Sequence, residues 1–253
     1  MFDYQPASNL LDNKTILITG AGDGIGRAAA VSFAGHGASV ILAGRTVSRL
    51  EEVYDEIEAL NPGRAIIHPL DLLTAGEEDF KVLANSIDEQ FACLDGVLHN
   101  AAQLGPRSPI EHYPYAQWQE LMQVNVNAAF LLTRALLAAL NRSQSGRLLF
   151  TASSVGRQGR AYWGAYSVSK FAVEGLMQVL ADELANTSAI RVNSINPGGT
   201  RTRMRAAAYP AENPATVPTP ESLMPVYLYL MGPQGEALHG QALDARSFDP
   251  LKF

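Results

Sequence analysis

The chain has 253 residues, of which 47% are apolar, and a formal net charge of −6. This length suits one α/β domain with a sizeable core, so we expect a single domain over 1–253. The acidic balance argues against attraction to phosphate backbones, and therefore against a nucleic-acid partner.

Three further features bear on where the protein works. The N-terminal residues, MFDYQPASNLLDN, lack the basic and apolar regions of a signal peptide. The longest apolar stretch, AAFLLTRALLAAL (128–140), is short and interrupted by Arg134, so we expect no membrane span. The single cysteine, Cys93, cannot form an internal disulfide. These features predict a cytoplasmic protein.

Short apolar runs alternate with helix-like stretches along the chain. The expected strands are 14–19, 39–44, 65–70, 95–100, 147–152 and 191–196, with a last short one near 241–245. The expected helices are 25–35, 47–59, 77–90, 116–141 and 165–186. Alternation at this spacing predicts parallel strands joined by right-handed crossovers, and near-continuous apolar strands indicate burial on both faces. The predicted fold is α/β, a doubly wound, Rossmann-type parallel sheet of about seven strands with helices on both faces.

One segment departs from this alternation. Residues 205–220, RAAAYPAENPATVPTP, contain four prolines and cannot extend a helix or a central strand for long. The segment is either a surface loop or a mobile lid over a pocket. We expect a substrate lid over 203–220, because the segment follows a strand end, where ligands bind in such sheets.

The stretch TGAGDGIG (19–26) follows the first expected strand and opens the first helix. Gly20, Gly24 and Gly26 allow a tight turn, close backbone approach and close helix packing. The helix N-terminus then offers free N–H groups to a pyrophosphate. A merely structural turn is the alternative, but the context of a strand before and a helix after favours nucleotide binding.

The end of the second strand indicates which nucleotide binds. An acidic side chain here usually holds a free ribose 2′-hydroxyl, but Gly44 has none. Arg45 and Arg49 offer cations suited to a 2′-phosphate, which favours NADP(H) over NAD(H). Asp23 opposes this choice because its charge would repel the phosphate. Alternatively, the two arginines belong to a solvated helix start.

After the third strand, Asp71 either accepts a hydrogen bond from adenine or caps a turn.

Tyr166 and Lys170 lie four residues apart and face the same way on an expected helix. A phenol has a pKa of about 10, and a nearby ammonium favours the phenolate. General acid–base catalysis works best when the pKa lies near the working pH. We therefore expect Lys170 to lower the pKa of Tyr166. By itself, the pair would more often be part of an amphipathic helix surface.

Several motifs together make the chain resemble the short-chain dehydrogenase/reductase family over roughly 13–245. The matching segments are TGAGDGIG (19–26), HNAA (99–102), Asn125 in VNVNAAF, Ser153 placed 13 residues before Tyr166, the Tyr166–Lys170 pair, Pro197-Gly198 followed by Thr202, and HGQALDA (239–245). Two positions in HNAA depart from the family, since His99 replaces an asparagine and Ala102 a glycine. Neither departure removes a catalytic group.

The resemblance implies four catalytic residues. Ser153 would hydrogen-bond the substrate oxygen, and Tyr166 would exchange a proton with it. Lys170 would lower the pKa of the phenol and hold the cofactor ribose, while Asn125 would hold a water that links Lys170 to solvent. Ser154 is a competing serine, but the 13-residue spacing favours Ser153. With the arguments above, the resemblance implies cofactor contacts from Gly20, Asp23, Gly24, Ile25, Gly26, Arg45, Arg49, Asp71, Leu72, Asn100, Ala101, Tyr166, Lys170, Pro197, Gly198, Thr200 and Thr202.

The expected function is NADP(H)-dependent hydride transfer between nicotinamide and a small-molecule carbonyl or secondary alcohol, with Tyr166 as the general acid/base. An alternative function is a non-catalytic NADP(H)-binding sensor or scaffold. Such proteins usually lack some of the catalytic residues, whereas all four are present here. A nucleotide-sugar epimerase or dehydratase shares the Tyr/Lys chemistry but is usually longer.

The sequence also bears on metals, substrate charge and assembly. The five histidines have no ligand spacing, so no metal site is expected. Arg107, Arg157 and Arg160 either bind an acidic substrate or are solvated loop residues. The helices 116–141 and 165–186 carry apolar and small residues on more than one face, which predicts a homodimer or homotetramer.

Overall fold

The structure, a computed structural model that describes residues 2–253, places strand β1 between β2 and β4. The strands are β1 (Thr15–Thr19), β2 (Ser39–Gly44), β3 (Ala65–Pro69), β4 (Gly96–His99), β5 (Arg147–Thr151), β6 (Arg191–Asn196) and β7 (Ala242–Asp244). Among the described residues they form one seven-stranded parallel sheet in the order β3-β2-β1-β4-β5-β6-β7. The predicted sheet is confirmed. Strand order reverses between β1 and β4, and ligands bind at the carboxyl ends of strands at such a point.

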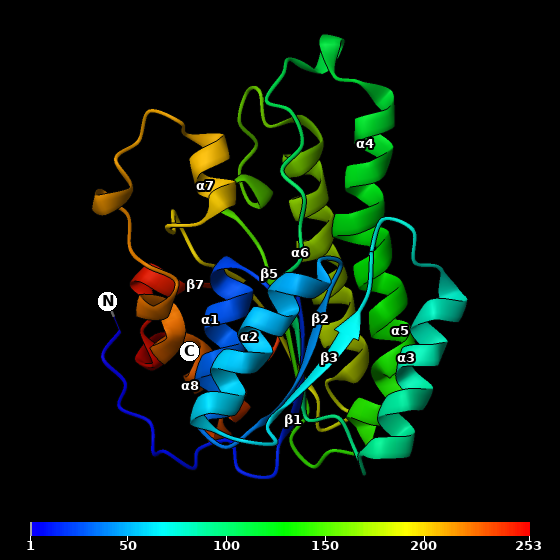
Figure 1. Cartoon of the computed structure of the whole chain (residues 1–253). Coiled ribbons are helices and arrows are strands. Elements are labelled where there is room, and N and C mark those ends of the chain that lie inside the picture. Colours follow the sequence, from blue (N-terminus) through cyan, green and yellow to red (C-terminus); the bar gives the residue numbers. More distant parts are fainter. Residues whose placement is uncertain (1) are drawn as a thin grey trace.

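Helices cover both faces of the sheet (Figure 1). Helices α1 (Gly24–Gly35), α2 (Val47–Leu60) and α8 (Met224–Met231) pack on one face, and α3 (Glu77–Gln90), α5 (Ala128–Asn141) and α6 (Gly164–Leu184) pack on the other. The alternation of β1 shows how the strands divide the core. Ile16 and Ile18 join the first hydrophobic cluster, whereas Leu17 joins the second.

The expected helix 116–141 is present but contains a local change of geometry. Helix α4 (Tyr115–Met122) leads into a π-helical turn, Gln123–Asn127, and then into α5. A π turn opens the hydrogen-bond ladder by one residue and often occurs at functional sites. By length and composition alone, the whole helix Tyr115–Asn141 is long and apolar enough to cross a membrane. The core helix of a soluble protein can have the same length and composition, so this is weak evidence for a membrane span. Leu132, Leu136 and Leu140 of α5 are buried in the second cluster.

The predicted lid segment begins as a short helix, α7 (Arg203–Ala208). The Thr202 hydroxyl caps this helix by accepting a hydrogen bond from the Arg205 N–H at 3.1 Å. The proline-containing part that follows forms loops and a single turn at Pro214–Thr216. Figure 1 shows α7 beyond the carboxyl ends of the strands, on the same side of the sheet edge as the start of α6.

Candidate active site

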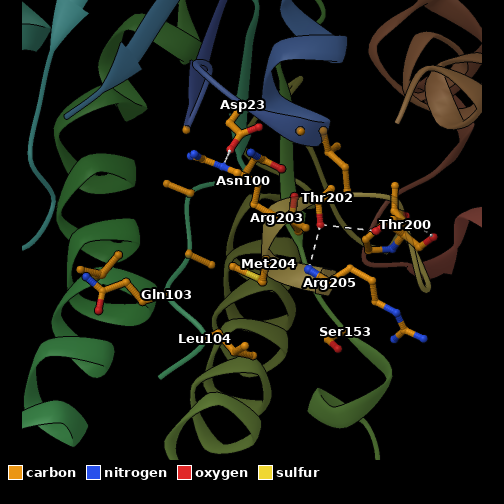
Figure 2. Close-up of a pocket in the computed structure, with 18 of the residues that line it drawn as sticks. Asp23, Asn100, Gln103, Leu104, Ser153, Thr200, Thr202, Arg203, Met204 and Arg205 are labelled. Atoms are coloured by element: carbon orange, nitrogen blue, oxygen red, sulfur yellow. Dashed lines mark hydrogen bonds and ion pairs between the residues drawn. The ribbon is translucent and has the colours of Figure 1, made fainter. Parts of the chain in front are cut away.

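A cavity of about 710 Å³ lies at the carboxyl ends of the strands, where the switch point of the sheet predicts a ligand. It runs from the glycine-rich loop to Tyr166 and Lys170. Helix α7 contributes Arg203, Met204 and Arg205 to its wall (Figure 2). The predicted site residues that line it are Gly20, Asp23, Gly24, Ile25, Arg45, Arg49, Asp71, Leu72, Asn100, Ala101, Ser153, Tyr166, Lys170, Pro197, Gly198, Thr200 and Thr202. Gly26 and Asn125 do not line this cavity.

The glycine-rich loop has the geometry of a close-approach turn. Gly20 and Gly24 have φ values of +68° and +52°, in the left-handed region that favours glycine. Gly26 lies beneath the loop, where an added Cβ would be 2.2 Å from the Gly20 carbonyl oxygen. Helix α1 begins at Gly24 with no side-chain cap, so its first N–H groups are available to a ligand phosphate.

The carboxyl end of β4 is tied to the end of β1. The Thr19 hydroxyl accepts hydrogen bonds from the N–H groups of Asn100 and Ala101, at 3.0 and 3.1 Å. The Asn100 amide donates to the Thr19 carbonyl at 3.3 Å. Asn100 therefore supports the glycine-rich loop from below, although His99 precedes it in place of the family asparagine. His99 is buried and pairs with the Thr133 hydroxyl at 2.9 Å, and burial lowers its pKa to about 3.

The expected nucleotide end of the cavity carries both signs of charge. Arg45 and Arg49 line it, as does Asp23. The Asp23 carboxylate forms an ion pair with Arg203 of α7 at 2.5 Å and lies 3.7 Å from the Arg49 guanidinium. Asp71 accepts a hydrogen bond from the Leu73 N–H at 3.0 Å, which is the turn-capping alternative of the two raised for it.

At the other end of the cavity, the Tyr166 side chain is buried against Trp163 at a ring-centroid distance of 5.8 Å. Burial raises the pKa of Tyr166 to about 12, and a hydrogen bond with Ser153 lowers it in part. Burial also lowers the pKa of Lys170 to about 8, against the opposing effect of the Glu174 carboxylate. The prediction that Lys170 lowers the pKa of Tyr166 below its usual value is wrong, because the pKa is raised: loss of hydration on burial outweighs the effect of Ser153.

Lys170 is held in place by the end of β5. Its ammonium donates a hydrogen bond to the Thr151 carbonyl at 2.6 Å. The ammonium has three N–H donors, so this bond leaves others for a ligand. Glu174, one turn further along α6, accepts hydrogen bonds from Arg157 at 2.8 Å and from the Ser194 hydroxyl at 2.5 Å. These bonds fix the part of α6 that carries Tyr166 and Lys170.

Asn125 lies in the π turn, and its side chain makes three hydrogen bonds. Its amide donates to the Gln103 carbonyl and to the Ser169 hydroxyl, both at 3.0 Å, and its oxygen accepts from the Gln103 N–H at 2.8 Å. A second cavity of about 10 Å³, lined by Asn125, Lys170 and Thr151 among others, lies beside it. This volume is close to the lower limit for one water molecule. Asn125 thus positions the loop after β4 and borders a water-sized space next to Lys170.

The strand-end segment after β6 also shapes the cavity. Gly198 has a φ of +71°, and its N–H donates to the Asn196 side-chain oxygen at 3.1 Å. The Thr202 hydroxyl, which caps α7, also lies 3.4 Å from the Thr200 carbonyl (Figure 2). Pro197 through Thr202 therefore lead the chain from the sheet into α7 along the cavity wall.

The sequence indicated the cavity wall around Tyr166 by segment rather than by residue. Met204, Ala208 and Tyr209 lie in the expected lid 203–220. The further lining residues at this end are Gln103, Leu104, Gly105, Val155 and Trp163. Most of these residues are apolar and lie in loops that follow different strands, so no local sequence pattern indicates them. Arg107 joins two of the lining residues, since its guanidinium carbon lies 5.0 Å from the Trp163 ring centroid and 5.1 Å from that of Tyr209.

The arginines considered for an acidic substrate have different surroundings. Arg157 pairs with Glu174 and with Asp244, at 2.8 and 3.0 Å, and neither it nor Arg107 lines the cavity. Arg160 does line the cavity. Only Arg160 of the three therefore has the position that the acidic-substrate alternative requires.

Comparison with known proteins agrees with this geometry. Residues 14–213 match the model of the short chain dehydrogenase family. This chain belongs to the short-chain dehydrogenase/reductase family. It is 51% identical over 243 residues to the uncharacterized oxidoreductase YciK of Escherichia coli K12, with 96% of each chain covered. The resemblance seen in the motifs is confirmed.

Two solved structures of family members carry a cofactor. One is a short chain dehydrogenase from Shigella flexneri 2a complexed with NADP, 50% identical with a TM-score of 0.92, covering 95% of this chain and 100% of that one. The other is a short chain dehydrogenase from E. coli CFT073 complexed with NADPH, 51% identical with a TM-score of 0.92 and the same coverage.

Proposed function

We propose that this protein is an NADP(H)-dependent oxidoreductase that transfers a hydride between nicotinamide and a carbonyl or secondary-alcohol substrate. The observation that carries the proposal is that one cavity joins the glycine-rich loop to Ser153, Tyr166 and Lys170. The NADP and NADPH complexes of the two similar structures support the choice of cofactor.

The residues present suit a dinucleotide. The loop around Gly20 and Gly24 lets backbone N–H groups approach a pyrophosphate, and Arg45 with Arg49 would receive a 2′-phosphate. Lys170, and the stretch from Pro197 to Thr202, would hold the nicotinamide half. When bound, the cofactor supplies or accepts the hydride at its nicotinamide ring.

The chain's own side chains would handle the proton. Tyr166 would donate its phenolic proton to the substrate oxygen during reduction and take it back during oxidation. Ser153 would donate a hydrogen bond to the same oxygen and so stabilise its developing negative charge. Lys170 would stabilise the phenolate that forms, and a water beside Asn125 would connect Lys170 to solvent. The raised pKa of Tyr166 keeps the phenol protonated at neutral pH, which suits the reduction direction.

The wall around Tyr166 favours an apolar substrate body. Leu104, Val155, Trp163 and Met204 line this end of the cavity, and an apolar carbonyl compound would bury its surface there. A cytoplasmic location and a homodimeric or homotetrameric state remain predictions from the sequence.

A screen of ketones, aldehydes, sugars and sterols with NADPH, read by nicotinamide absorbance, tests the proposal. Tyr166→Phe should lose nearly all turnover on any substrate found, while its NADPH affinity, measured by fluorescence titration, stays close to that of the wild type. Tyr162→Phe is the matched control, because Tyr162 is exposed and does not line the cavity. NADPH binding with no turnover across the panel would favour the sensor alternative. Full activity in Tyr166→Phe would remove the proton-transfer role.

A further inference from the structure

Asp23 presents an electrostatic problem for the proposed cofactor. It lies in the glycine-rich loop and lines the same cavity as Arg45 and Arg49. Its carboxylate is 3.7 Å from the Arg49 guanidinium, so an anion bound to Arg49 would lie within a few ångströms of a like charge. Two unit charges about 6 Å apart repel enough to weaken binding about threefold at the dielectric constant of water and about 100-fold at the lower value typical of a protein surface. For side chains that are about half exposed, a weakening of about tenfold lies between these limits. An uncompensated Asp23 would therefore disfavour a 2′-phosphate.

Arg203 compensates this charge from another part of the chain. Its guanidinium forms the ion pair with Asp23 at 2.5 Å, across a separation of 180 residues. Both residues line the cavity, one in the glycine-rich loop and the other at the first position of α7 (Figure 2). The cap that Thr202 makes on the backbone of α7 fixes where this position lies.

We propose that Arg203 is a specificity-determining residue for the cofactor: by neutralising Asp23, it makes the glycine-rich loop compatible with a 2′-phosphate. The inference rests on the proposed NADP(H) dependence. With Arg203 in place, the group of Asp23, Arg45, Arg49 and Arg203 has three positive charges and one negative. Without Arg203, the Asp23 carboxylate would draw Arg49 toward itself and compete with the phosphate for it.

A contribution to folding stability does not explain this ion pair, because both of its side chains are exposed. The Arg203 and Asp23 side chains are 61% and 47% exposed, and ion pairs between such groups contribute little to folding. The ion pair instead affects the binding of charged ligand groups in the same cavity, because the Arg203 charge partly cancels the Asp23 charge a few ångströms away. A cofactor without a 2′-phosphate should be much less sensitive to the pair.

The experiment measures the dissociation constants of NADPH and NADH by fluorescence titration at low ionic strength. The variants are Arg203→Gln, Asp23→Asn and the double variant. We expect Arg203→Gln to weaken NADPH binding about tenfold and NADH binding less than threefold. Asp23→Asn should bind NADPH at least as tightly as the wild type. In the double variant NADPH affinity should return to within about threefold of the wild type, because no carboxylate remains to be neutralised.

The control is the exposed ion pair between Arg142 and Asp88, which has similar exposure and lies outside the cavity. Arg142→Gln and Asp88→Asn should leave both dissociation constants unchanged. The inference is overturned if Arg203→Gln weakens NADPH and NADH equally, if it weakens neither, or if Asp23→Asn fails to restore the double variant. Failure of the wild type to bind either nucleotide would instead overturn the proposed function.

Discussion

The Nζ atom of Lys170 lies 5.7 Å from the centroid of the Tyr166 ring, and its ammonium donates to the Thr151 carbonyl. Both side chains are buried on the same face of α6, and burial penalises the charged form of each. Burial therefore raises the pKa of the phenol to about 12 and lowers that of the amine to about 8. Across the neutral range the phenol is the proton donor, and Lys170 is the group of the two that titrates.

This difference predicts the pH dependence of carbonyl reduction. A lowered pKa means that Lys170 is charged below about pH 8 and loses its proton as the pH rises through that value. Loss of the charge removes stabilisation of the phenolate that forms at Tyr166. We expect kcat/KM with NADPH to be nearly constant below pH 8 and to fall above it.

Lys170→Arg tests the assignment, because a guanidinium stays charged throughout this range. Whatever activity remains in that variant should show no decline near pH 8. Persistence of the decline would assign it to another group. Parallel fluorescence titrations of NADPH over the same pH range would separate an effect on cofactor binding from one on proton transfer.

Replacement of the two adjacent serines should separate their roles. Both Ser153 and Ser154 line the cavity, but Ser153 is the one whose side chain lowers the pKa of the Tyr166 phenol. Loss of a donor to a developing oxyanion typically costs about 10²-fold to 10³-fold in kcat. We expect that loss for Ser153→Ala and a change of less than about threefold for Ser154→Ala, with KM for NADPH unaltered in both. Equal losses in the two variants would contradict the assignment.

The sequence predicted those parts of the molecule that depend on local pattern. The glycine-rich loop and the strand before it follow from adjacent residues, and the motif spacing brings Ser153 and Tyr166 to one cavity. Helix α8 was missed because PVYLYL, within 224–231, is apolar all round and contains Pro225, so neither a helical nor a strand period appears. The π turn at Gln123–Asn127 has no residue type that marks it.

Features that depend on distant contacts could not be predicted. The pair of Asp23 and Arg203 joins residues 180 positions apart, and nothing near either residue indicates the other. The pKa of Tyr166 had the wrong predicted direction, because its burial depends on how other segments, among them the loop with Trp163, pack against the helix. The sequence predicted that the Lys170 amine lies near the Tyr166 phenol, but it did not predict which residues surround the two groups.

The packing beneath the glycine-rich loop predicts a sensitive position. A Cβ at Gly26 would meet the Gly20 carbonyl oxygen at 2.2 Å and the Asn100 amide at 2.7 Å, so the loop or α1 would have to move. We expect Gly26→Ala to lower the free energy of unfolding by about 1–3 kcal/mol and to weaken NADPH binding at least tenfold. Urea unfolding and fluorescence titration measure the two effects.

Gly35→Ala is the matched control for this substitution. Gly35 lies at the other end of α1, and an added Cβ there would meet nothing within 4 Å. We expect this variant to be as stable as the wild type or up to about 1 kcal/mol more stable, because alanine favours the helix. Its NADPH affinity should be unchanged. Wild-type NADPH affinity in Gly26→Ala would contradict the proposed close approach of the loop to the cofactor.

Helix α6 presents an apolar strip that predicts where a second copy of the chain would pack. Val168, Phe171 and Val179 are 42–55% exposed, and they recur at spacings that place them along one side of the helix. Gly175 lies between them, and the space where its Cβ would be is open, so a partner helix could approach closely. We expect the wild type to be a dimer or tetramer and Phe171→Glu to be mainly monomeric in sedimentation velocity. Val82→Glu on α3 is the control, since Val82 is 59% exposed but lies on another helix. A monomeric wild type, or equal dissociation in both variants, would show that this strip is not the interface.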